Sequence, residues 1–137
     1  MLSIDTGKME AMLKILVVGL GGFLGAVLRY GISRGIHRVS ENAFPYGTLI
    51  VNLLGCFTIG LLISMVQDRA ALDSPTRLFL VVGLLGSFTT FSTLGYETIG
   101  LIEKNFLSQA FLSIGGNLIL GLGAVFLGQF ISRVLSA

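Results

Sequence analysis

The chain has 137 residues, of which 53% are hydrophobic and only 12% are charged. An ordinary soluble domain has about 25% charged residues, so this composition argues against a water-soluble globule. The formal net charge of +2 comes from scattered residues and is too small to neutralise a run of phosphates, which argues against a nucleic-acid partner. A single cysteine and a single histidine exclude an intrachain disulfide and the ligand clusters of zinc or haem sites.

Four uncharged stretches of the sequence predict four transmembrane helices. Charges at bilayer depth are costly, and an apolar run of about 20 residues is long enough to cross a membrane. The stretches are 14, 26, 19 and 28 residues long. The first can cross if Lys14 and Arg29 at its ends extend their charges to the membrane surface, or if Arg29 faces a polar interior. We therefore expect an all-α membrane protein with a single domain. That domain covers residues 1–137, with spans at about residues 11–33, 47–66, 78–102 and 106–131.

The distribution of basic residues leaves the orientation of the chain open. Four spans put both termini on one side of the membrane, and an excess of Lys and Arg normally marks the cytoplasmic side. Here the terminal side collects five basic residues and the opposite side collects four. This near tie favours a chain that inserts in both orientations, which permits an antiparallel dimer. A weakly biased single orientation explains the count equally well.

The middle of the predicted third span is rich in hydroxyl groups. Five of the seven residues from Ser87 to Thr93 are Ser or Thr, and glycines flank them. Hydroxyls at that depth need hydrogen-bond partners, and glycine makes local unwinding of a helix inexpensive. We therefore predict a broken third helix, whose unwound backbone can present carbonyls to a cation or N–H groups to an anion. The alternative is that these side chains bond back to the carbonyls of their own helix.

The predicted second and fourth spans contribute neutral polar side chains. Gln109, Ser113 and Asn117 follow one another at four-residue spacing, which places them on one face of a helix, and Asn52 lies early in the second span. Each of these side chains can donate a hydrogen bond, whereas a cation or proton pathway is usually lined by carboxylates. The pattern therefore favours a small anion. The alternative is that the stripe joins helices, at about 0.6 kcal/mol per hydrogen bond.

Three segments of the sequence together match a known family. They cover residues 21–25 in the first span, 45–55 at the start of the second and 83–93 in the third, followed by Glu97. With these segments the chain resembles the Fluc (CrcB) fluoride channels, and the resemblance covers about residues 12–133. The motifs Gly-Thr-Leu-Ile-Val-Asn and Thr-Thr-Phe-Ser-Thr make this resemblance specific.

The resemblance implies a channel that passively exports cytoplasmic fluoride and so protects the cell from fluoride toxicity. The implied assembly is an antiparallel, dual-topology homodimer in the cell inner (plasma) membrane, which each chain crosses several times. The backbone carbonyls of Gly86 and Thr89 from both subunits would hold a structural sodium ion (Na+) at the dimer interface. The positions that match the fluoride-binding pore are Asn52, Phe91, Ser92, Thr93 and, on the polar track of the fourth span, Gln109, Ser113 and Asn117.

One pore position departs from the family pattern. The second phenylalanine of the family's aromatic box falls at residue 94, which is Leu94 here. Leucine keeps the bulk of phenylalanine but lacks the positively polarised ring edge that can face an anion. Three consequences are open: slower conduction, a single phenylalanine that suffices, or a homologous second subunit whose phenylalanine completes the pore. We expect a functional homodimer.

Two other kinds of membrane protein have a comparable size. A four-span proton-coupled transporter would need a carboxylate inside its first span, and residues 15–28 contain none. A non-conducting subunit of a heterodimeric fluoride channel is favoured by Leu94, but it gives the polar stripe and the broken helix no purpose. An enzyme is disfavoured because no nucleophile, base and orienting acid can plausibly converge within the membrane.

Overall fold

The computed structural model describes residues 6–39, 43–62 and 74–135. Within these ranges the chain forms helices and no strand, which confirms the predicted all-α fold. The label η marks segments with the hydrogen bonds of a π-helix. In chain order the elements are α1 (Thr6–Val39), α2 (Tyr46–Leu61), α4 (Pro75–Arg77), η2 (Leu78–Leu85), α5 (Gly86–Phe88), α6 (Phe91–Glu103), α7 (Leu107–Gly115), η3 (Gly116–Leu120) and α8 (Gly121–Leu135).

Three helical segments are long and apolar enough to cross a membrane. They are Thr6–Arg38, Pro75–Glu103 and Leu107–Leu135. The fourth apolar helix, Tyr46–Leu61, is shorter, and residues 63–66 of the span expected there lie outside the described residues. Large apolar side chains are exposed along the surfaces of all four segments. Such a surface is compatible with lipid, because hydrocarbon tails are as apolar as these side chains.

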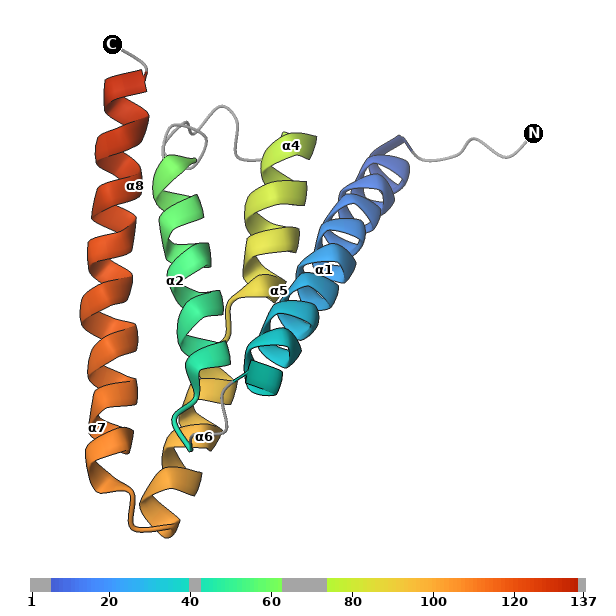
Figure 1. The fold of residues 1–137 in the computed structure, drawn as a ribbon. Helices are drawn as coiled ribbons and strands as arrows, with labels where there is room; N and C mark the ends of the chain where they lie inside the picture. Colours follow the sequence, from blue (N-terminus) through green and yellow to red (C-terminus); the bar gives the residue numbers. More distant parts are fainter. Residues whose placement is uncertain (1–5, 40–42, 63–73, 136–137) are drawn as a thin grey trace.

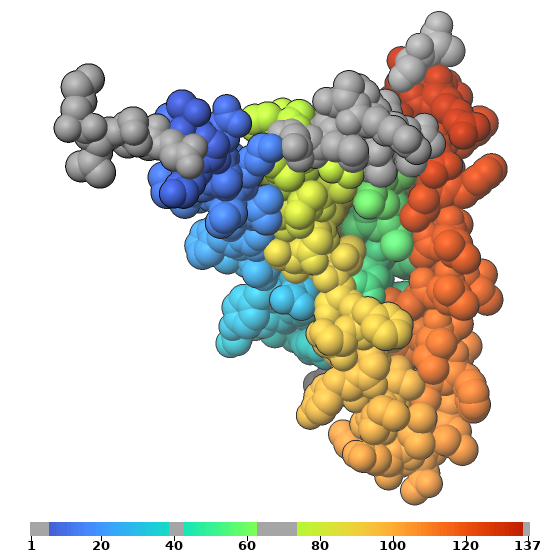
Figure 2. Space-filling view, turned by 180° about the vertical axis from the view of Figure 1, so that it is seen from behind, coloured from blue at the N-terminus to red at the C-terminus, as the bar shows by residue number. Residues whose placement is uncertain are grey.

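The helices form an open bundle in which neighbours along the chain run in opposite directions (Figure 1). The start of α1 and the end of α8 lie at the same end of the molecule, as an even number of spans requires. At the opposite end, the α6–α7 hairpin extends beyond the end of α1, which is visible from both sides (Figures 1 and 2). Asn105 closes the turn of this hairpin in the left-handed conformation, with φ of 60°, which asparagine tolerates better than most residues.

Glycines bring α1 and η2 into backbone contact. A Cβ atom at Gly21 would overlap the carbonyl oxygen of Phe79, and one at Gly25 would overlap the carbonyl oxygen of Leu84. From the other side, a Cβ at Gly83 would lie 2.6 Å from the carbonyl oxygen of Val18. Close approach of this kind stabilises helix pairs in a membrane, where association depends on van der Waals packing rather than on the hydrophobic effect.

Close backbone contact at glycines also joins α2 to α8. A Cβ at Gly60 would overlap the carbonyl oxygen of Val125, and one at Gly128 would overlap that of Phe57. The two helices therefore cross with glycine facing backbone on both sides.

The third span is broken at Thr89 and Thr90, as predicted. Helix α5 ends at Phe88, and both threonines have extended backbone, with φ and ψ of −81° and 157° at Thr89 and −151° and 120° at Thr90. Thr90 then caps α6, because its side-chain oxygen accepts a hydrogen bond from the N–H of Thr93 at 3.2 Å. The break offsets α6 sideways from α5 (Figure 1).

Candidate functional site

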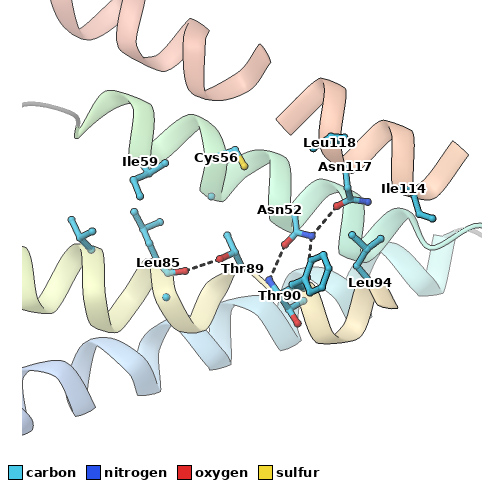
Figure 3. Close-up of a pocket in the computed structure, with 14 residues that line it drawn as sticks. Asn52, Cys56, Ile59, Leu85, Thr89, Thr90, Leu94, Ile114, Asn117 and Leu118 are labelled. Atoms are coloured by element: carbon cyan, nitrogen blue, oxygen red, sulfur yellow. Dashed lines mark hydrogen bonds between the residues drawn. The ribbon is translucent and has the colours of Figure 1, made fainter. Parts of the chain in front are cut away.

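A cavity of about 600 Å³ lies beside the break of the third span. Its walls come from α2, from η2 and α5, from the first turn of α6, and from the junction of α7 with η3. None of the described residues that line it carries a charged side chain. The sequence-predicted site residues that line it are Asn52, Gly86, Thr89, Phe91, Leu94 and Asn117 (Figure 3).

Asn52 connects α2 to the broken backbone. Its Oδ1 atom accepts the N–H of Thr90 at 2.8 Å, and its Nδ2 atom donates to the carbonyl oxygen of Thr90 at 3.2 Å. These two bonds satisfy backbone groups of Thr90 that no helix can satisfy at the break, and an unpaired backbone group is costly at this depth. One turn later, Gly55 leaves room for the methyl group of Thr89, which a Cβ at that position would overlap.

Asn52 also contacts the fourth span. Its Nδ2 atom donates to Oδ1 of Asn117 at 2.8 Å, and Nδ2 of Asn117 donates to the carbonyl oxygen of Ser113 at 2.9 Å. Asn117 is the second residue of the π-helical segment η3, where the regular α-helical pattern is interrupted. Three helices thus meet through two asparagine side chains (Figure 3).

The hydroxyl groups at the break have two different roles. Thr89 donates to the carbonyl oxygen of Leu85 at 3.1 Å, so it bonds back to its own helix, as the alternative interpretation expected. Thr90 instead serves the next helix, where it donates to the hydroxyl of Thr93 at 3.0 Å and lies 3.3 Å from that of Ser92. The break is therefore stabilised by its own side chains as well as by Asn52.

The carbonyl groups around the break fit a cation better than the side chains do. In a continuous helix the N–H of Thr90 would bond to the carbonyl of Gly86, but here it bonds to Asn52. The carbonyl of Gly86 thereby loses its helical partner, and no hydrogen bond to the carbonyl of Thr89 is found in the described part of the chain. Among the same residues no group of three acidic, histidine or cysteine side chains could hold a metal.

Phe91 and Leu94 face different surroundings although they lie one turn apart. Phe91 is 85% exposed in the protomer, whereas Leu94 is 8% exposed and lies near Asn117 (Figure 3). The ring of Phe91 is therefore available to a neighbouring molecule. Leu94 fills space inside the protomer.

The remaining predicted site residues do not line this cavity. Gln109 lines a second groove, of about 720 Å³, with Phe44 and Tyr46, and Ser113 is completely buried. Ser92 is exposed and Thr93 is half-buried. The stripe expected on the fourth span is thus divided, with only Asn117 at the break. Among the described residues, two buried oxygen atoms of the stripe have no hydrogen-bond partner, Oγ of Ser113 and Oε1 of Gln109, and neither has Oγ1 of Thr98 on the neighbouring α6.

A family model described as "CrcB-like protein, Camphor Resistance (CrcB)" matches residues 16–129. The chain belongs to the CrcB family. It is 46% identical over 119 residues to a protein of Chloroflexus aurantiacus named "Fluoride-specific ion channel FluC". The matched residues cover 87% of this chain and 94% of that protein. Two further relatives carry the same name. The protein of Clostridium novyi is 39% identical, and the match covers 93% of this chain and 99% of that protein. The protein of Nitratidesulfovibrio vulgaris is 40% identical, and the match covers 90% of this chain and 100% of that protein.

These relatives are named as ion channels, which is a non-enzymatic function. Together with the long apolar helices, they identify this member of the CrcB family as a multi-pass membrane protein.

Among the residues that line the cavity of this CrcB protein, sequence reasoning missed two with polar side chains, Thr90 and Cys56. Thr90 was one of five hydroxyl residues, and its function lies in its backbone groups, which no side-chain pattern indicates. Cys56, the single cysteine of the chain, lines the cavity one turn beyond Asn52. Its four-residue spacing from Asn52 is the signal that places both on one face of α2.

Proposed function

We propose that this chain is a fluoride-selective channel that passively exports cytoplasmic fluoride and so protects the cell from fluoride toxicity. Membership in the CrcB family and the names of the relatives support this proposal. The observation that carries it is the break at Thr89 and Thr90, which faces neutral amides inside a cavity without charged walls. An anion can bind weakly and leave such a site, whereas a basic side chain would trap it and a carboxylate would repel it.

Liposomes that contain only this chain are expected to release fluoride and retain chloride. The Leu94→Phe variant tests whether a second aromatic ring is needed, because Leu94 is buried beside the cavity. Fluoride and chloride electrodes read in parallel give the result. Release by the wild type supports a channel built from one kind of subunit. If only Leu94→Phe released fluoride, the homodimer would be contradicted in favour of a channel that needs a second homologue. If neither protein released fluoride, the proposed function would be contradicted.

The functional unit that we propose is an antiparallel homodimer in the inner membrane of the cell. Three observations support a second copy. The basic residues are nearly balanced between the two sides, Phe91 projects from the protomer with 85% of its surface exposed, and the cavity is open. A second copy would bring another aromatic ring and another pair of free carbonyls to the same region.

A sodium ion at the dimer interface is part of this proposal. Gly86 and Thr89 offer two carbonyl oxygens per chain, which is too few for a cation, whereas two chains together offer four. Purified protein dialysed into sodium-free buffer is therefore expected to retain one sodium ion per two chains in elemental analysis, with the dialysis buffer as the blank. A content equal to the blank, or one ion for every chain, would contradict the shared site.

A further inference from the structure

One face of α1 is exposed over several turns and changes from apolar to basic along its length. Its residues, which recur at three- or four-residue spacing, are Phe23, Val27, Tyr30, Arg34 and Arg38. We call this set the outer face of α1. The glycines that pack against η2, Gly21 and Gly25, lie two positions from Phe23 and Val27, which places them on the opposite side of the helix. Helix α1 also stands at the edge of the bundle in both views (Figures 1 and 2).

The basic end of this outer face lies at the depth of the lipid headgroups. Arg34 follows Lys14 by 20 positions, and a helix rises about 1.5 Å per residue, so the two charges stand about 30 Å apart. This distance is about the thickness of the hydrocarbon core of a bilayer. With Lys14 at one surface, Arg34 reaches the other, and Arg38 extends one turn beyond it. Tyr30, one turn before Arg34, lies where tyrosine is enriched in membrane proteins.

The guanidinium of Arg34 is held in place by Tyr30. Its Nη1 atom donates to the hydroxyl oxygen of Tyr30 at 2.6 Å, and its Cζ atom lies 5.7 Å from the centroid of the Tyr30 ring. A guanidinium has five N–H groups, so four remain after this bond. Among the described residues, these four groups and the side chain of Arg38 have no hydrogen bond or ion pair. Glu41, the nearest acidic residue in the sequence, lies outside the described residues.

Two other basic residues of α1 are not part of this face. Arg29 is half-buried, and its spacing of five positions from Arg34 places it on a different side of the helix. His37 interacts electrostatically with the carboxylate of Glu97 on α6. Basic residues in the last turn of a helix also complement its dipole, but Arg34 precedes that turn. The outer face therefore carries positive charge that the dipole alone does not explain.

We propose that the outer face of α1 binds an anionic phospholipid, with the phosphate at Arg34 and Arg38 and the acyl chains along Phe23 and Val27. A guanidinium can donate two parallel hydrogen bonds to phosphate oxygens, and Tyr30 sets the orientation of the Arg34 guanidinium in advance. A zwitterionic lipid has the same phosphate but brings an ammonium group next to two arginines. The inference depends on the membrane location of the chain and not on the ion that the proposed channel conducts.

Two lipids that share their acyl chains test the proposal by native mass spectrometry of the purified protein in detergent. Phosphatidylglycerol is expected to bind at least about fivefold more tightly than phosphatidylcholine. Arg34→Gln should weaken phosphatidylglycerol binding about fivefold, the effect of one basic residue at a membrane surface, and adding Arg38→Gln should remove the preference. Tyr30→Phe keeps every charge and loses only the hydroxyl that accepts from Arg34, so we expect a loss of about threefold.

Lys104→Gln is the matched control for these variants. Lys104 is exposed and follows the end of α6, in the α6–α7 turn. Its replacement removes the same charge as Arg34→Gln but leaves the outer face of α1 intact. Binding of both lipids should therefore stay at the wild-type level.

Four results would overturn the proposal, and none of them requires ion flux. The first is equal binding of the two lipids by the wild type. The second is an equal loss in Lys104→Gln and Arg34→Gln, which would show a general attraction of charge. The third is displacement of phosphatidylglycerol by inorganic phosphate beyond the effect of sodium chloride at the same ionic strength, which would show a site for free anions. The fourth is an elution volume of the combined arginine variant shifted toward the monomer, which would assign this face to a second copy of the chain.

Discussion

Replacing Phe91 by isoleucine is expected to stop fluoride efflux without disturbing the protein. The side chain of Phe91 is 85% exposed and lines the cavity, so its loss removes little packing within the protomer. The ring edge that isoleucine lacks carries positive partial charge and can face an anion without binding it tightly. We expect efflux from liposomes to fall at least about tenfold, equivalent to about 1.4 kcal/mol of barrier, with an unchanged elution volume in size-exclusion chromatography.

The matched control for Phe91 is Phe126→Ile. Phe126 lies on α8, is 72% exposed and does not line the cavity, so the same substitution there should leave efflux at the wild-type rate. Equal efflux from Phe91→Ile and the wild type would remove Phe91 from the pore. Equal losses in both variants would show that the change acts on the exposed apolar surface in general.

Replacing Gly25 by alanine is expected to destabilise the whole bundle. The added Cβ would overlap the carbonyl oxygen of Leu84, and neither backbone can yield without separating α1 from η2. Overpacking of this kind costs about 1–3 kcal/mol and more when backbone must move. We expect a lower midpoint of thermal unfolding in detergent and a larger aggregated fraction.

Gly19→Ala is the control for this helix. Apart from the nearby backbone of α1 itself, no described atom lies within 4 Å of a Cβ built at Gly19, and alanine favours a helix by about 1 kcal/mol over glycine. This variant should match or exceed the thermal midpoint of the wild type. If Gly25→Ala unfolded at the same temperature as Gly19→Ala, close backbone contact between α1 and η2 would not be what holds these helices together.

The sequence by itself determined the features that depend on local composition. Uncharged stretches determined the apolar helices, because each charged residue placed in lipid raises the free energy of insertion by itself. The hydroxyl and glycine cluster around Ser87 determined the break of the third span, and the family motifs determined the family. The helix ends were less accessible, since α1 runs from Thr6 to Val39 and so extends beyond the expected span at both ends.

Only the tertiary structure decided which polar groups meet. Four-residue spacing placed Gln109, Ser113 and Asn117 on one face, but neighbouring helices divide that face, so Asn117 alone reaches the break. The bonds of Asn52 to Thr90 and Asn117 join segments 38 and 65 residues apart. Such contacts depend on the distance between the helices. Glycine contacts, such as that of Gly60 with α8, set this distance, and no local pattern in the chain encodes it.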